Sequence, residues 1–299
     1  MPTFTNYSIV GKKESVADVI TNISPTDTPF ISNIGKDKIT NTLFQWQTDA
    51  LAAPRVNANV EGYTAVSATL APTTMVSNVT QILEKTFEVT DTIEAISLYG
   101  RAKEAAYQAG KASSELKRDL EFACVGTKQT QVLGSSSVVR QFAGAQAQID
   151  PTMIISTGGT TTALSEANIT AALQKVYEQG GNPKALMVTP TDSLVVADLA
   201  RAAGRYREIS ADGADSKRIV NTVNLYVSPF GEVSVQLNRF LAAGDSIVYD
   251  PAMFQLAWLR PWTRETLSKN GDSTRMRIVG EVSLKNKSPL AAAIIRRQT

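Results

Sequence analysis

ISLYGRAKEAAYQAGKASSELKRDLEFACV, residues 96–125, is the stretch that decides the fold. Its apolar residues recur in steps of three and four, which is typical of the buried face of an α-helix. Charged residues, including Lys117 and Glu121 at i, i+4, are expected on the opposite face. The pattern predicts one helix, roughly 40 Å long, ending near Gly126. The residues of the expected buried face are Tyr99, Ala102, Ala106, Ala109, Ala112, Leu116, Leu120 and Ala123.

Before this helix, residues 41–93 predict a long β-hairpin. Phe44 and Trp46 alternate with glutamines, and Val56, Ala58 and Val60 alternate with polar residues. Residues 79–89 continue the extended pattern as a return strand. The tip, residues 61–74, is rich in Gly, Ala, Ser, Thr and Pro. Because such residues cannot form a core alone, we expect this segment to become ordered on a partner surface.

Residues 1–40 are interpreted as an N-terminal arm. The apolar spacing at residues 15–23 (Val16, Val19, Ile20, Ile23) predicts a short helix. Pro25 and Pro29 favour a non-helical path after it, since proline restricts both itself and the residue before it. Phe30, Ile31 and Ile34 are then the expected anchors on a body, either the chain's own or a neighbour's.

After the long helix, residues 127–163 are interpreted as a loop-rich connector, and helices and strands then mix. Ser165 is the expected N-cap of one helix, and Thr191 or Asp192 of another that runs toward Gly204. This order predicts the α+β class. The expected strands are 185–188, a hairpin of 225–228 and 233–237, 247–249, 254–258, 275–284 and 290–295.

The composition argues against an enzyme. The chain has 299 residues, a formal net charge of +2, one cysteine (Cys124) and no histidine. Without histidine, Ser-His-Asp, Cys-His and His-ligated zinc sites are excluded. The N-terminus lacks signal-peptide features, and no apolar run reaches the roughly 18 residues that a membrane helix needs. We therefore expect no catalytic residues, cofactor, metal or membrane.

Several smaller motifs have plain structural interpretations. Residues 244–247 (Gly-Asp-Ser-Ile) resemble the start of a GDSL-type hydrolase block, but that chemistry needs a histidine, so a turn into a strand is expected. Trp258 and Trp262 flank Arg260, and core packing is favoured over a cation–π stack. Arg296 and Arg297 could contact nucleic acid only weakly. The carboxylates considered as metal ligands, and interpreted instead as caps and loop residues, are Asp192, Asp198, Asp212 and Asp215.

Several short sequence motifs carry more specific information than the hydrophobic patterns do. They are TPF at 28–30, IGK at 34–36, FQWQTDAL at 44–51, AYQAGKA at 106–112, ELKRD at 115–119, LSKNGDS at 267–273 and IVGEVSL at 278–284. Together with the element order, they resemble the HK97-type major capsid proteins of tailed bacteriophages. The resemblance covers nearly the whole chain.

This resemblance implies an HK97-like division of the chain: an arm (1–40), an extended loop (41–93), a peripheral domain (94–163) with a spine helix (96–125), an axial domain (164–260) and return strands of the peripheral domain (261–299). It implies self-assembly as pentamers and hexamers into an icosahedral head shell around double-stranded DNA. The shell would form in the bacterial host cytoplasm with a scaffolding protein, a portal and a decoration protein, and become part of the virion.

Two features of the resemblance are tested against this sequence. Some members carry a long N-terminal scaffolding domain; only about 40 residues precede the loop here, so a separate scaffold is expected. Some crosslink a loop lysine to a neighbour, but the tip 61–74 has no lysine and Lys85 lies on the return strand, so no crosslink is expected. The alternatives are an encapsulin-like nanocompartment shell and a phage tail or decoration protein.

Overall fold

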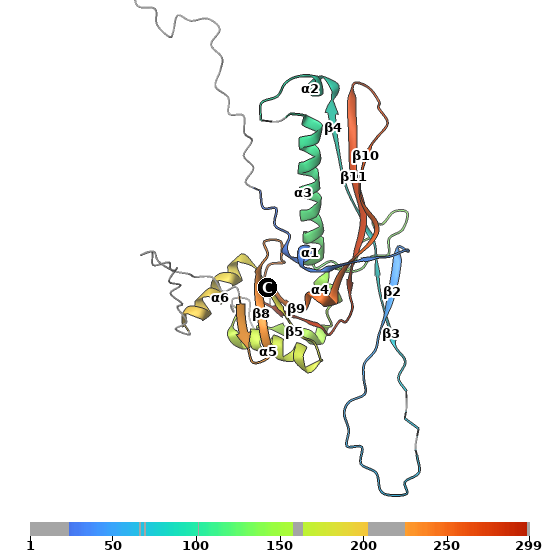
Figure 1. The fold of residues 1–299 in the computed structure, drawn as a ribbon, viewed down its shortest axis with the longest axis vertical. Helices are drawn as coiled ribbons and strands as arrows, with labels where there is room; N and C mark the ends of the chain where they lie inside the picture. Colours follow the sequence, from blue (N-terminus) through green and yellow to red (C-terminus); the bar gives the residue numbers. More distant parts are fainter. Residues whose placement is uncertain are drawn as a thin grey trace, which may run out of the picture.

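The computed structural model describes residues 24–65, 67–68, 70–100, 102–157, 164–202 and 225–297. The helix predicted at 15–23, together with Asp212 and Asp215, lies outside these residues. Figure 1 shows an elongated α+β molecule with three parts. A long helix lies beside a long sheet, a second sheet with its own helices lies below, and a narrow ribbon extends away from both.

The long helix, α3, spans Glu104–Val125 and so begins later than predicted. Tyr99 and Ala102 lie outside it because Gly100 adopts a left-handed conformation (φ 74°) that interrupts the helix, and a separate short helix, α2 (Asp91–Ala95), precedes that residue. Gly126 ends α3 as expected. A side chain there would place its Cβ 2.5 Å from the Phe240 carbonyl oxygen, so the position requires glycine.

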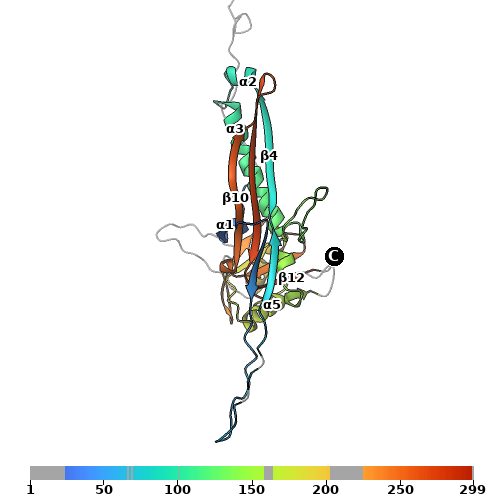
Figure 2. The same cartoon turned by 90° about the vertical axis from the view of Figure 1, so that its right-hand side faces the viewer.

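The long sheet packs against α3, and its strands run side by side along the helix (Figure 2). Ala112, Leu116 and Ile278 form the small core between helix and sheet. The strand order is β1-β10-β11-β4. The strands are β1 (Gly35–Lys38), β10 (Phe254–Thr266), β11 (Ser273–Asn286) and β4 (Gln81–Thr90).

The predicted hairpin 41–93 is shorter than expected. Only its base is paired, as the antiparallel ribbon of β2 (Leu43–Thr48) and β3 (Thr74–Val79). Its return strand, β4, belongs instead to the long sheet, where it pairs with β11 from Gln81 to Thr90. The described residues between 49 and 73 contain no strand, so the alternation at 56–60 was wrongly interpreted as one. Within the ranges that the structure describes, no strand pairs with these residues.

The second sheet has six strands in the order β5-β12-β9-β6-β8-β7. The helices α5 (Glu166–Glu178) and α6 (Pro190–Ala202) accompany it. The strands are β5 (Ile154–Ser156), β12 (Ala292–Arg296), β9 (Asp245–Tyr249), β6 (Ala185–Val188), β8 (Gly231–Leu237) and β7 (Leu225–Ser228).

Strand β12 corrects the prediction that residues 261–299 all return to the peripheral part. It pairs with β9 and β5 inside the six-stranded sheet, with Ala292–Ile295 buried. A continuous apolar run of this kind fits a strand covered on both faces. The connector 127–163 is also more ordered than expected, since β5 contributes an edge strand to the same sheet. It further holds α4 (Ala145–Gln148) and the short 3-10 helix η1 (Pro151–Met153); the related η2 is Pro251–Met253.

Helix caps explain where the shorter helices begin. The Ser165 hydroxyl accepts a hydrogen bond from the Asn168 amide at 3.3 Å, which confirms the predicted cap of α5. For α6 the predicted cap was wrong: the Thr189 hydroxyl accepts from the Asp192 amide at 3.2 Å. Proline favours the first helical position, and Pro190 therefore makes the preceding threonine the cap.

The same rule corrects the arm root. Residues Pro29–Asn33 form the short helix α1, not a non-helical path, because Pro29 stands at its first position. The Phe30 ring is fully buried and packs edge-on to Phe254 (5.7 Å between ring centroids) and against Tyr249 (5.5 Å). The main core therefore continues from the six-stranded sheet into the arm root, and the predicted anchor Phe30 is confirmed on the chain's own body.

Candidate assembly surfaces

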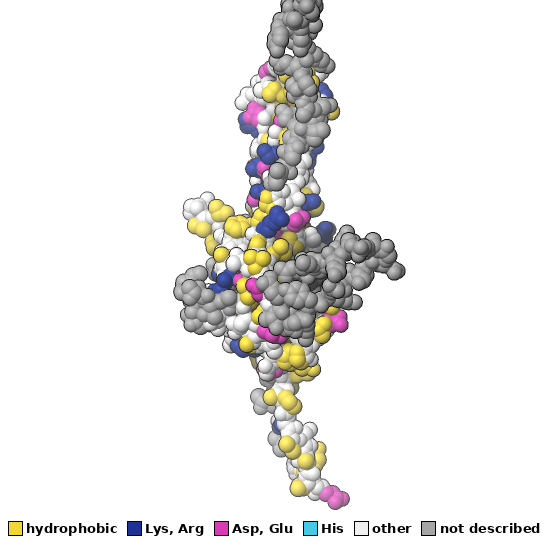
Figure 3. Space-filling view, turned by 90° about the vertical axis from the view of Figure 1, so that its left-hand side faces the viewer, with side chains coloured by type: hydrophobic (Ala, Val, Ile, Leu, Met, Phe, Trp, Pro, Cys, Tyr) yellow, Lys and Arg dark blue, Asp and Glu magenta, His cyan; other side chains and the backbone are white. Residues whose placement is uncertain are grey.

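The extended loop, defined here as the described residues between 49 and 73, is apolar and exposed. Leu51 is 100% exposed, Val56 93% and Leu70 88%. The loop hangs below the ribbon β2–β3 (Figure 1), and apolar side chains are spread along it in Figure 3. Exposure of single apolar residues is ordinary, but a whole projecting segment of them marks an interaction surface.

The root of this loop is fixed by a buried carboxylate, Glu281 on β11. Its Oε1 accepts from the Thr80 hydroxyl at 2.6 Å and from the Arg140 guanidinium, and its Oε2 accepts from Arg260 Nε at 3.0 Å. Arg140 also donates to the Thr80 carbonyl oxygen at 2.7 Å. Thr80 is the residue between β3 and β4, so these bonds hold the ribbon in one direction relative to the long sheet.

Asn78, near the end of β3, also fixes the ribbon. Its side-chain amide nitrogen donates to the carbonyl oxygens of Leu284 (2.7 Å) and Ala143 (3.2 Å). Its oxygen accepts from the amides of Ala143 (2.8 Å) and Val79 (2.9 Å). The side chain is fully buried and makes all four of the hydrogen bonds open to it. The exposed loop therefore projects from a hydrogen-bonded base.

The arm root is held by a second buried carboxylate, Glu121 of α3. It accepts from the backbone amides of Phe30 (2.8 Å) and Ile31 (2.9 Å) and from Asn238 Nδ2 (2.6 Å). Desolvation raises the pKa of Glu121 above its usual range, although these three hydrogen bonds oppose the rise. The prediction that Glu121 faces solvent and pairs with Lys117 was wrong: the carboxylate joins arm, spine helix and six-stranded sheet.

Sequence patterns missed both carboxylates. Glu121 sits one step outside the apolar stripe of α3, and Glu281 interrupts an apolar strand. In the second case a usable signal existed, because a single acid inside IVGEVSL (278–284) has to find a partner when it is buried. The partners come from distant segments, so their identity could not be foreseen.

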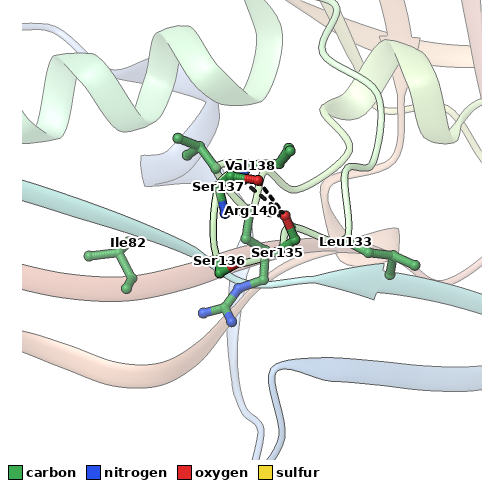
Figure 4. A pocket seen from close by; sticks show the side chains of 9 residues that line it. Ile82, Leu133, Ser135, Ser136, Ser137, Val138 and Arg140 are labelled. Atoms are coloured by element: carbon green, nitrogen blue, oxygen red, sulfur yellow. Dashed lines mark hydrogen bonds between the residues drawn. The ribbon is translucent and has the colours of Figure 1, made fainter.

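Close to the loop root lies an open groove of about 590 Å³. Its walls are Ile82 and the loop 133–140, and Leu133 (64% exposed) and Val139 (82%) are its most exposed apolar residues. Figure 4 shows Ile82 and Leu133 on either side of Arg140, with Ser135 accepting hydrogen bonds from the amides of Ser137 and Val138. The lining is apolar and serine-rich, which suits contact with protein more than catalysis.

The outer face of the long sheet is laced with ion pairs. Arg275 pairs with Glu88 at 2.7 Å, and Arg277 with Glu265 at 2.6 Å. The pKa of Glu88 is lowered, first by the hydrogen bond from Ser273 and then by that from Arg275. Lys85 lies on β4, the strand that returns from the loop, and pairs with Glu115 of α3 at 3.0 Å. The expected lack of a crosslink stays a prediction.

The hydrolase-like motif is a turn into a strand, as expected. Gly244 has a left-handed φ of 81°, and Asp245 opens β9. The Asp245 carboxylate is fully buried and binds Arg296 through both its oxygens (3.0 and 3.1 Å), with Lys128 Nζ at 3.1 Å. It therefore serves to hold the C-terminal strand in place.

Asp192 has a similar role. It is buried, accepts from the Thr189 and Ser246 hydroxyls, and pairs with Arg297 at 2.7 Å. The structure does not bring it together with Asp198 in a ligand set: no group of three metal-ligating side chains occurs in the part of the chain that is described. Because Arg296 and Arg297 are both engaged by carboxylates, they form no free cationic patch.

The two tryptophans pack as predicted. Trp258 and Trp262 lie against the main core with their rings 5.5 Å apart in an edge-on arrangement. Arg260, between them in sequence, donates to Glu281 instead. Within the described ranges, no helix has the length and apolar composition needed to cross a membrane.

Comparison with known proteins agrees with this architecture. The model of the SU10 major capsid protein family matches residues 3–299. The major capsid protein of Escherichia phage Phieco32 is 29% identical, over 98% of this chain and 96% of that protein. The capsid protein of cyanophage A-1(L) has the same fold, with a TM-score of 0.69 at 12% identity over 98% of both chains.

The fold itself is shared more widely. The shell protein of the SrpI encapsulin from Synechococcus elongatus PCC 7942 matches with a TM-score of 0.62 at 9% identity, over 96% of this chain and 92% of that one. A likeness at this identity concerns the fold alone. The fold alone fits both a phage capsid protein and an encapsulin shell protein. The family model covers almost every residue and favours the phage capsid protein. The chain belongs to the SU10 major capsid protein family and is a structural subunit of a phage head shell.

Proposed function

We propose that copies of the chain pack as pentamers and hexamers into a closed icosahedral shell, and that each extended loop lies across a neighbouring copy. The observation that carries this proposal is the exposure of Leu51, Val56 and Leu70 on a loop whose root is rigid. A rigid root aims the loop, and the apolar side chains supply the contact free energy once a neighbour covers them.

The body offers surfaces that suit such neighbours. Strand β4 forms one edge of the long sheet and β7 one edge of the six-stranded sheet. On β7, Leu225 and Val227 are both more than half exposed. Open edges and exposed apolar side chains are the features that a second copy can cover. Each contact is small, and repetition around a closed shell makes the sum stable.

The proposal gives the shell a cargo of double-stranded DNA that is enclosed without sequence recognition. The net charge of +2 is far from the basic excess of a dedicated nucleic-acid binder. Arg296 and Arg297, the cationic pair singled out in the sequence, are neutralised by Asp245 and Asp192. A separate scaffolding protein, a portal and a decoration protein belong to the proposal through the family resemblance.

The test compares the natural chain with a variant in which residues 51–72 are replaced by a short Gly-Ser turn, so that β2 and β3 stay joined. Both are expressed with and without the neighbouring phage genes and viewed by negative-stain electron microscopy. The natural chain should give uniform icosahedral particles, and the variant folded subunits without shells. A matched control, Asn57→Ser in the same loop, should assemble normally. Closed shells from the shortened loop would overturn its role.

The contents of the particles test the proposed cargo. DNA-filled particles, or empty shells that package DNA when the portal is present, support enclosure of double-stranded DNA. Shells that never take up DNA with the portal present would contradict it.

A further inference from the structure

The groove at the loop 133–140 keeps its shape through the chain's own hydrogen bonds. Val132 and Gln141 pair through two backbone bonds of 2.9 and 3.0 Å, and the Ser135 amide donates to the Val138 carbonyl oxygen at 2.9 Å. These bonds close the loop as a short hairpin (Figure 4). A preformed groove of about 590 Å³ with exposed apolar walls is a surface that a second chain can cover.

The groove lies at the start of an open sheet edge. Ile82, which lines it, is half exposed and belongs to β4, and β4 pairs with β11 on one side. In the part of the chain that is described, no strand pairs with its other side. When an extended peptide adds to such an edge, main-chain hydrogen bonds supply affinity and pockets for alternate side chains supply specificity. Edge and groove together therefore favour an extended segment with apolar residues at every second position.

The extended loop contains a segment of this kind. Val56, Ala58 and Val60 alternate with Asn57 and Asn59, and all five residues are exposed. Because successive side chains of an extended chain point to opposite faces, the three apolar side chains can face the groove together. The segment belongs to the loop that extends away from both sheets (Figure 1), so the groove that it fits is that of another copy.

Charge complements this fit. Arg140, which lines the groove, shares the carboxylate of Glu281 with Arg260, so this cluster of three side chains carries one net positive charge. Residues 56–65 contain one acid, Glu61, and no base. Opposite charges on two surfaces favour their encounter and fix their register.

We infer that residues 56–60 of one copy dock as an extended strand in the groove of a neighbouring copy. The inference rests on the proposed contact between copies and names the surface that receives the loop. Arg140 then has two roles. It donates to the Thr80 carbonyl oxygen at the root of its own loop, and it lines the site that receives the loop of the neighbour.

Cysteines on separate chains test the docking. One chain carries Leu133→Cys in the groove or, as the matched control, Ser114→Cys on an exposed position of α3. The other chain carries a single cysteine at one of the positions 56 to 60 and a tag that changes its mass. The two chains are expressed together with the neighbouring phage genes, and the shells are oxidised mildly. The natural Cys124 is fully buried and stays out of the reaction.

Mixed covalent dimers with Leu133→Cys should be most abundant at position 56, 58 or 60. They should be at least about fivefold fewer at 57 and 59, because those side chains point away from the groove. Shells that give no dimers with Leu133→Cys, dimers without this alternation, or more dimers with Ser114→Cys would overturn the docking and leave the proposed contact between copies standing. Closed shells from the chain with the shortened loop would overturn both.

A second pair of variants needs no cysteine. Val56→Asp and Asn57→Asp each place a carboxylate on the exposed loop, so both chains should fold with unchanged circular dichroism. Val56→Asp should lower the yield of closed shells at least about tenfold, because it places an unpaired charge against an apolar wall. Asn57→Asp should leave the yield nearly unchanged. Equal yields from the two variants would contradict the docking, whether or not the cysteine chains assemble.

Discussion

Glu121 and Glu281 show how single residues join segments that are far apart in the sequence. Each is a carboxylate buried in an otherwise apolar region, and each takes its hydrogen bonds from at least two other segments. A single buried hydrogen bond adds little net stability. Removing the buried acceptor costs more than that, because the donors left behind stay buried without a partner. The two residues nevertheless differ in charge balance, and that difference gives separate predictions.

Glu121 has no cationic partner among its hydrogen bonds, and its folded-state pKa is raised by desolvation. The folded state therefore binds the proton of Glu121 more tightly than the unfolded state does. The contribution of this group to stability consequently falls as the pH rises above the ordinary glutamate pKa of about 4.5. The free energy of unfolding, measured with urea from pH 4 to 8, should fall for the natural chain relative to the Glu121→Gln variant as the pH rises. A constant difference across this range would contradict the assignment.

Glu281 lies between Arg140 and Arg260, so its loss leaves two cations without their shared anion. Glu281→Gln should reduce the free energy of unfolding by about 3 kcal/mol, the usual cost of breaking a buried ion pair. Arg260 is the matched control, since more than half of its side chain is exposed. Arg260→Gln should cost about 1 kcal/mol or less. Chemical denaturation of both variants measures the two values.

At the scale of elements, the loop and its root should behave differently. In separate subunits, limited proteolysis should cut first between residues 49 and 73, where the described backbone has no strand pairing and the side chains are exposed. In closed shells the same bonds should be protected, because a neighbour covers them. Mass spectrometry of the fragments gives the sites. Equal cleavage in subunits and shells would argue against loop contacts between copies.

Elements were predictable where the sequence has a strong local signal. The 3.6-residue spacing located α3, and Ser165 located α5, because helix periodicity and capping depend on neighbouring residues. The sheet to which each strand belongs was harder to predict from the sequence. Strand β4 reads as the second half of a hairpin, and β12 as part of the long sheet, because strand pairing is decided by partners distant in the chain. The buried carboxylates that hold the loop root and the arm root, Glu281 and Glu121, were missed for the same reason.

At the scale of the whole molecule, the C-terminal strand holds the lower part together. β12 lies between β5 and β9, and Arg296 and Arg297 reach the buried Asp245 and Asp192. Truncation after residue 290 should therefore abolish soluble folded protein, since it uncovers two strands and leaves two buried carboxylates without their arginine partners. Removal of residues 298–299 alone is the control and should change the melting temperature little. A folded, soluble product of the longer truncation would contradict this account.

The place of β12 also orders events during synthesis. β12 is the last strand of its sheet in chain order, and β5 and β9 are joined only through it. A nascent chain that has not yet reached β12 can form α3 and pair the strands of the long sheet, but its six-stranded sheet stays open. We therefore expect a growing chain to offer a second copy the surfaces of the long sheet before it can offer those of the six-stranded sheet.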